Sequence, residues 1–145
     1  MRKLIFAISM LAFAGSAALA DATLDRQALM KERGKIVGSL SKVVKGEQPF
    51  DAAEVLAALQ ALEANEGKLD IDTLFPAGTD TGDTTASPKI WEDMAGFKAA
   101  NAKYLDNVKA AVAAAPADVD ALKTQMGVPG SDCSSCHQGY RIKKS

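Results

Sequence analysis

The sequence LDRQALMKERGKIVGSLSKVV occupies residues 24–44 and carries a clear periodic pattern. Its apolar side chains recur at steps of three and four residues, which is the spacing of one face of an α-helix. The residues on this face are Leu29, Met30, Ile36, Val37, Leu40, Val43 and Val44. The stretch therefore predicts a long amphipathic helix, which must bury its apolar face against other elements.

The residues after Pro49 predict a second helix. Asp51 is a typical helix N-cap, and Glu54 three residues later completes a capping box. Gly67 predicts the end of this helix. Its inward face is expected to consist of Val55, Leu56, Leu59 and Leu62.

A long connection separates the second helix from the third. Residues 68–87 are rich in Gly, Asp and Thr and show no helical period. Ser87 followed by Pro88 predicts the start of a third helix, which should run to about Ala115.

A fourth helix is expected to begin near Val119. Pro129 predicts an interruption, after which Ser131 or Asp132 would cap a final helical segment. No alternating pattern supports a sheet. We therefore expect an all-α fold, an antiparallel four-helix bundle.

Composition agrees with one helical domain. The chain has 145 residues, of which 48% are apolar, 24% charged and only 6% aromatic, and its formal net charge is −1. These values argue against a disordered, collagenous or nucleic-acid-binding chain. Because large side chains are scarce in the apolar faces, we expect something other than side chains to fill part of the interior.

The first twenty residues predict a secretory signal peptide. Arg2 and Lys3 precede an apolar run at residues 4–13, and small residues lead to a cleavage site after Ala20. The mature domain would then span residues 21–145, with a formal charge of −3. The apolar run is too short to span a bilayer. We therefore expect a periplasmic protein that is not a membrane protein in its mature form.

The sequence CSSCH at residues 133–137 has the C-x-x-C-H pattern of c-type haem attachment. In this pattern Cys133 and Cys136 bind the haem covalently, and His137 gives its imidazole to the iron. His137 is the only histidine of the chain. The alternatives are a Cys133–Cys136 disulfide in an oxidising compartment and a thiol–disulfide redox site, while a zinc site has too few ligands.

The chain as a whole resembles the class II c-type cytochromes, the family of cytochrome c′ and cytochrome c-556. The segments that carry the resemblance are Arg26-Gln27, Val43-Val44-Lys45-Gly46, Pro49-Phe50-Asp51-Ala52, Phe75-Pro76-Ala77-Gly78-Thr79, Pro88-Lys89-Ile90-Trp91 and the CSSCHQGYR sequence from Cys133. The resemblance implies a four-helix bundle with one covalent haem c near the C-terminus. It also implies pairing of two copies through the first two helices.

The second axial ligand of the iron would decide the function. Without a second histidine the remaining strong ligand is methionine, and Met30, Met94 and Met126 are available after signal cleavage. Met126 precedes Cys133 closely and is poorly placed for the opposite face, while Met94 fits the core. In the family, the position four residues after the residue corresponding to Arg26 faces the distal side of the haem. The resemblance therefore implies Met30 as the ligand, with packing over an open iron as the alternative.

Arg26, Arg141 and Tyr140 are further candidates for contact with the cofactor. Arg26 and Arg33 fall within the apolar face of the first helix, where each could extend to solvent. The resemblance favours Arg26 as a partner for a haem propionate. Arg141 follows His137 by four residues and is expected on the same helix face, where it could tune the imidazole. Tyr140 is expected to pack against the haem.

These features predict a periplasmic electron-transfer cytochrome that is not an enzyme, with His137 and Met30 binding a low-spin iron. Its partners would be other redox proteins, and neither nucleic acid nor a membrane is expected. The alternative is a five-coordinate, high-spin cytochrome c′ that binds nitric oxide or carbon monoxide. A third hypothesis is a haem-free helical module held by a disulfide.

Overall fold

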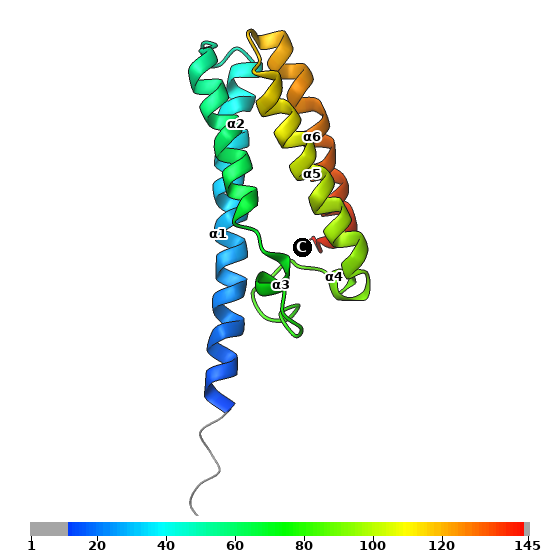
Figure 1. The fold of residues 1–145 in the computed structure, drawn as a ribbon. Coiled ribbons are helices and arrows are strands. Elements are labelled where there is room, and N and C mark those ends of the chain that lie inside the picture. The colour runs from blue at the N-terminus through cyan, green and yellow to red at the C-terminus, as the bar shows by residue number, and fades with distance from the viewer. Residues whose placement is uncertain (1–11, 144–145) are drawn as a thin grey trace, which may run out of the picture.

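Four long helices form an antiparallel bundle in the computed structural model, which describes residues 12–143. The long helices are α1 (Ala12–Val44), α2 (Ala52–Gly67), α5 (Met94–Ala114) and α6 (Val119–Tyr140). Neighbouring helices run in opposite directions, and one end of α1 extends beyond the bundle (Figure 1). The described residues include no strand, only an isolated bridge between Ala86 and Arg141. The predicted all-α bundle is confirmed.

Two apolar clusters lie at opposite ends of the bundle. The upper apolar cluster lies toward the end of the bundle where α1 is joined to α2. Its buried residues are Leu40, Val43, Val55, Leu59, Leu62, Tyr104, Val108, Ala111 and Leu122. The lower apolar cluster lies beside the long connection, and its buried residues are Leu69, Ile71, Phe75, Ile90 and Phe97. Core packing is therefore interrupted between the two clusters, and the candidate site lies there.

Helix α1 is longer than the sequence predicted. It begins at Ala12 and passes without a break through the expected cleavage site after Ala20. Alanine has the highest helix propensity, so this segment continues the helix readily. Arg2, Lys3 and most of the apolar run of the predicted signal peptide lie outside the described residues. Within the described residues, no helix is long and apolar enough to cross a membrane.

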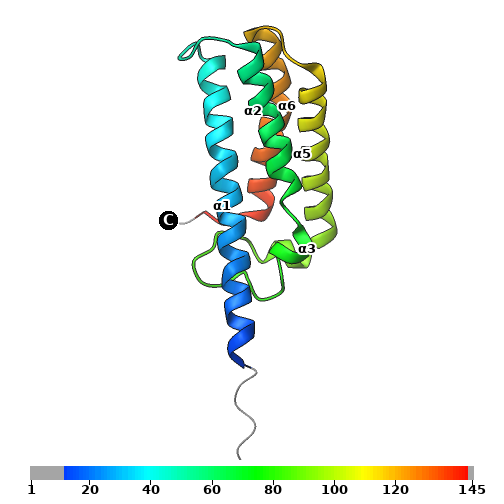
Figure 2. The ribbon, with the colours of Figure 1, turned by 60° about the vertical axis from the view of Figure 1, so that its left-hand side comes forward.

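Helix α2 begins and ends as predicted. The Asp51 carboxylate accepts a hydrogen bond from the backbone N–H of Glu54 at 2.9 Å, and the helix ends at Gly67. Of its expected inward residues, Leu56 is only half-buried, while the others are buried. The connection that follows contains one short helix, α3 (Ile71–Leu74), and wraps around the lower end of the bundle (Figure 2).

The predicted third helix is divided into two. The short α4 (Lys89–Glu92) is separated from α5 by Asp93, whose φ of −132° and ψ of 55° are not helical. The Asp93 carboxylate accepts a hydrogen bond from the backbone N–H of Gly96 at 3.0 Å and so caps α5. Local side-chain bonding of this kind competes with a continuous helix, which explains the break.

The predicted interruption at Pro129 is wrong. Helix α6 continues through this residue, which lies buried inside it. The expected cap at Asp132 is also absent, because its carboxylate instead binds Asn107 at 2.6 Å and Lys103 at 3.0 Å, both from α5. Because Pro129 is buried, packing against the bundle outweighs the hydrogen bond that proline cannot donate.

Candidate haem-binding site

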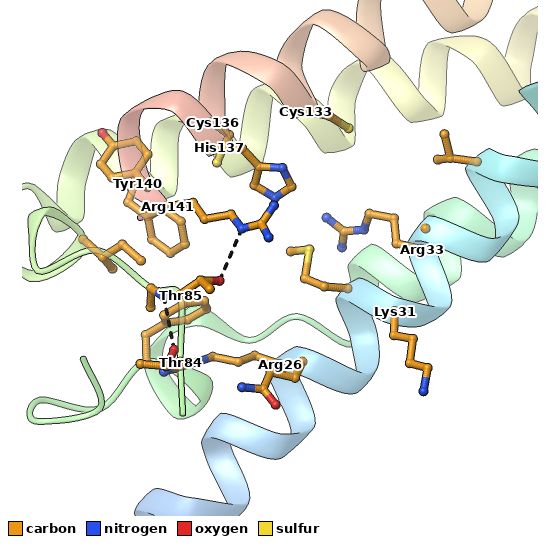
Figure 3. Close-up of a pocket in the computed structure, with 18 residues that line it drawn as sticks. Arg26, Lys31, Arg33, Thr84, Thr85, Cys133, Cys136, His137, Tyr140 and Arg141 are labelled. Carbon is orange, nitrogen blue, oxygen red and sulfur yellow. Dashed lines mark hydrogen bonds between the residues drawn. The ribbon is translucent and has the colours of Figure 1, made fainter. Parts of the chain in front are cut away.

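A cavity of about 530 Å³ lies between α1, α6 and the long connection. It is lined by Arg26, Gln27, Met30, Lys31, Arg33, Gly34, Val37, Phe75, Thr84, Thr85, Ala86, Ile90, Phe97, Cys133, Cys136, His137, Tyr140 and Arg141. Figure 3 shows side chains of α1 and α6 facing one another across it. All seven residues that the sequence proposed for the site therefore line one cavity.

The C-x-x-C-H residues occupy the α6 side of the cavity. Cys133 and Cys136 are half-buried and not joined in a disulfide. Burial raises the pKa of both thiols. A thiol–disulfide redox site needs the opposite, a lowered cysteine pKa. Because both cysteines line the cavity, they are placed to hold a group inside it.

The surroundings of His137 favour the neutral form of its imidazole, which is the form that binds iron. Its pKa is lowered, chiefly by burial and further by the positive charges of Arg141 and Arg33. The imidazole is therefore neutral over more of the pH range and has a free nitrogen lone pair for a metal. Figure 3 shows its ring projecting from α6 toward α1.

Met30 lines the cavity from α1, the side opposite α6. Its side chain is 36% exposed, so it is not a core methionine. Met94 packs instead in the lower apolar cluster, and Met126 packs against the upper cluster. Of these three methionines, the cavity receives only Met30.

Arg26 is buried and does not extend to solvent. Its guanidinium donates hydrogen bonds to the carbonyl oxygen of Leu74, to the hydroxyl and carbonyl oxygens of Thr79, and to Thr84 Oγ1. It also lies 4.9 Å from the centre of the Phe75 ring. The sequence predicted a cofactor contact for Arg26 but missed that the arginine fastens the long connection to α1.

Arg141 and Tyr140 lie at the end of α6. Arg141 is beyond the helix, in extended conformation, and its Nε donates to Thr85 Oγ1 at 3.3 Å. The prediction that Arg141 lies on the same helix face as His137 is therefore wrong. Its side chain nevertheless extends toward the imidazole (Figure 3). The Tyr140 ring packs edge to face against Phe97, with 5.2 Å between ring centres.

A buried polar cluster on the α1 side was not predicted. Arg33 forms an ion pair with Glu66, and its Nε donates to Asn65 Oδ1 at 3.0 Å. Its guanidinium lies 4.9 Å from the centre of the Tyr104 ring. The only signal in the sequence was the charge of Arg33 within an apolar helix face, and nothing there indicated Glu66 as its partner.

The charged side chains that line the cavity fit a haem. All four of them are basic: Arg26, Lys31, Arg33 and Arg141. The walls also include aromatic and aliphatic side chains such as Phe97, Ile90 and Val37. An apolar cavity with basic side chains and an attachment motif suits a flat apolar ring system that carries carboxylates.

Comparison with known proteins decides the family. A family model described as Cytochrome C' matches residues 21–141. The chain belongs to the cytochrome c′ family. It is 41% identical over 131 residues to cytochrome c-556 of Agrobacterium fabrum, covering 90% of this chain and 88% of that protein. It is 36% identical over 129 residues to cytochrome c′ of Alcaligenes xylosoxydans, covering 86% of this chain and 95% of that protein.

Solved cytochromes c′ share the fold. A structure of cytochrome c′ from Rhodobacter sphaeroides superposes with a TM-score of 0.81 at 31% identity, covering 87% of this chain and 98% of that one. The nitric oxide complex of a cytochrome c′ variant from Alcaligenes xylosoxidans gives a TM-score of 0.77 at 36% identity, covering 88% and 98%. The chain is thus a c-type cytochrome of the haem electron-carrier class, with covalently bound haem c as its cofactor. Cys133 and Cys136 fit the attachment.

Proposed function

We propose that this cytochrome is a periplasmic electron carrier whose single haem iron is bound by His137 and Met30. The observation that carries the proposal is that His137 from α6, whose pKa is lowered, and Met30 from α1 line the same cavity. When bound, the haem supplies one-electron chemistry by alternating between ferric and ferrous iron. A thioether ligand favours the ferrous state and raises the reduction potential.

The protein residues have separate roles in this proposal. Cys133 and Cys136 hold the haem, and the basic side chains Arg26 and Arg141 balance the propionates. Tyr140 packs against the haem edge. No catalytic residue is assigned, because transferring single electrons requires only a fixed and shielded redox centre.

Export to the periplasm is part of the same proposal. The family match begins at residue 21, directly after the expected cleavage site. Attachment through a C-x-x-C-H motif also suits an exported chain. Mass spectrometry of the protein secreted by a haem-maturing bacterium should give a mature chain that starts at Asp21. A mature chain that retains Arg2 and Lys3 would contradict cleavage.

A gas-binding, five-coordinate cytochrome c′ is the second candidate. The relatives named cytochrome c′ favour it. A related solved structure is a nitric oxide complex of a cytochrome c′ variant. In this alternative Met30 lies near the iron without binding it.

The absorption spectrum of the haem-loaded protein tests the two candidates. We expect a low-spin spectrum in both oxidation states, with the weak far-red band that marks sulfur bound to ferric iron. A high-spin spectrum without that band would favour gas binding. A colourless protein would overturn both and leave the haem-free helical module.

A further inference from the structure

The buried carboxyl group of Glu66 lies beside the haem cavity but has no role in ligation or attachment. It is fully buried at the end of α2 and forms an ion pair with Arg33. Arg33 itself lines the cavity and points into it (Figure 3). The ion pair therefore places one positive charge against the cavity and one negative charge behind it.

We propose that Glu66 is a redox-linked proton-binding site, which takes up a proton when the haem accepts an electron. The inference rests on the proposed function in electron transfer. In the step, the Glu66 carboxylate gains an O–H bond to a proton from solvent, while one electron from a one-electron redox protein reduces ferric iron to ferrous iron. Release of the electron reverses both changes.

The low polarity around the ion pair makes the coupling strong. Charges interact more strongly in a protein interior than in water, so an electron added in the cavity makes a nearby carboxylate less favourable. Burial already raises the pKa of Glu66, although Arg33 and the Asn101 side chain oppose the rise. The protonation of the Glu66 carboxyl group should therefore change when the charge in the cavity changes by one unit.

The other groups around Glu66 do not compete for the proton. Arg33 faces it from α1 and stays charged. Tyr104 faces it from α5 with a pKa of about 12, so it stays neutral. Cys133 faces it from α6 and does not titrate once it is bound to haem. Asp132, also on α6, is already paired with Lys103.

A hydrogen-bonded chain connects the ion pair with the surface. Asn65 accepts from Arg33 Nε and donates from Nδ2 to Glu32 Oε2 at 2.9 Å. The Glu32 side chain is 48% exposed and lies 3.6 Å from Lys68 Nζ. The polar network around the buried ion pair therefore extends to solvent.

The test is the reduction potential of the haem-loaded protein between about pH 4 and about pH 9, which spans the titration of a carboxyl group with a raised pKa. The wild-type potential should fall as Glu66 loses its proton, with a slope of up to about 59 mV per pH unit for one proton per electron. Glu66→Gln should remove this part of the slope and keep the higher, low-pH potential.

Two variants that remove charges of opposite sign should shift the reduction equilibrium in opposite directions, which distinguishes an electrostatic role of Glu66 from a structural one. At a pH where Glu66 is ionised, Glu66→Gln should raise the reduction equilibrium constant roughly tenfold, as expected for one unit charge at a distance on the order of 10 Å. Arg33→Met raises the pKa of Glu66, so this variant is compared at a pH high enough to ionise Glu66 in it as well, where it should lower the constant by a similar factor. Damage to the fold would instead shift both variants in the same direction. Glu47→Gln, an exposed carboxyl in the α1–α2 loop, is the matched control and should follow the wild type.

Two results would overturn the inference: equal pH dependence in wild type and Glu66→Gln, or shifts of the same sign in both variants. If Glu66→Gln does not fold, the infrared difference between reduced and oxidised wild type replaces it. This spectrum should contain the carbonyl stretch of a newly protonated carboxyl group, and its absence would overturn the proposal. The absorption spectrum of the same samples reports the iron ligands independently, so failure of His137 and Met30 ligation is recognised separately.

Discussion

Tyr140 Oη donates a hydrogen bond to Asp93 Oδ2 at 2.9 Å, which joins the end of the haem-binding helix to the break between α4 and α5. The other oxygen of the same carboxylate caps α5 through Gly96. A Cβ at Gly96 would meet this carboxylate, so a larger residue there would displace it and disturb both hydrogen bonds. The last turn of α6, directly after His137, is thus anchored by a side chain that also begins another helix.

Removing this anchor should weaken the fold by graded amounts. Tyr140→Phe loses one hydrogen bond and should lower the free energy of unfolding slightly. Asp93→Ala loses the helix cap as well and should cost about 1 kcal/mol more. Urea unfolding of the haem-loaded protein measures both. Equal effects of the two variants would show that the cap contributes nothing.

Arg26 should be essential for the order of the long connection. Arg26→Met removes the donor to Leu74, Thr79 and Thr84 and leaves buried oxygens without a partner, which should cost about 2–4 kcal/mol. Thermal unfolding checks the stability, and limited proteolysis should cut within residues 75–87. Lys31→Met is the control, because Lys31 lines the same cavity but is exposed, so its loss should change stability by less than about 0.5 kcal/mol. Unchanged proteolysis of Arg26→Met would contradict the anchoring role.

Met30→Ala should remove the second axial ligand and leave a coordination position of the iron free. Without the thioether the ferrous protein should become five-coordinate and bind carbon monoxide readily, whereas the wild type should bind it poorly. Carbon monoxide titration followed by absorption measures the difference. Met94→Ala removes a methionine from the lower apolar cluster and should bind carbon monoxide like the wild type. Equal binding by wild type and Met30→Ala would show that Met30 is not the ligand.

Glu66 should make stability fall as pH rises. Its pKa in the folded protein is raised above the ordinary value of 4.5, so above pH 4.5 the unfolded chain binds fewer protons at this site than the folded protein. The contribution of Glu66 is therefore fully present below pH 4.5 and is lost as pH rises through the folded-state pKa. The difference in unfolding free energy between wild type and Glu66→Gln, measured by urea unfolding at several pH values, should decrease over this range. A difference that grows with pH would contradict the sign.

Features that depend on a few neighbouring residues were predictable. The Asp51 cap, the end of α2 at Gly67 and the C-x-x-C-H motif each lie within one or two helical turns, so local spacing indicates them. The helix break at Asp93 is also local, but an aspartate inside an apolar periodic segment is equally compatible with a continuous helix. Only the structure shows that Asp93 is non-helical, with its carboxylate accepting a hydrogen bond from the backbone N–H of Gly96.

The sequence by itself determined the helical class and the attachment motif, because periodicity and short-range spacing act along the chain. The resemblance to the cytochrome c′ family added Met30 and Arg26, which line the same cavity as the motif. Only the tertiary structure decided that α6 continues through Pro129, that Arg26 fastens the long connection and that Arg33 pairs with Glu66. The physical reason is that these outcomes depend on groups from different helices. Packing the helices together creates the buried surroundings in which a proline is tolerated and a charge requires a partner.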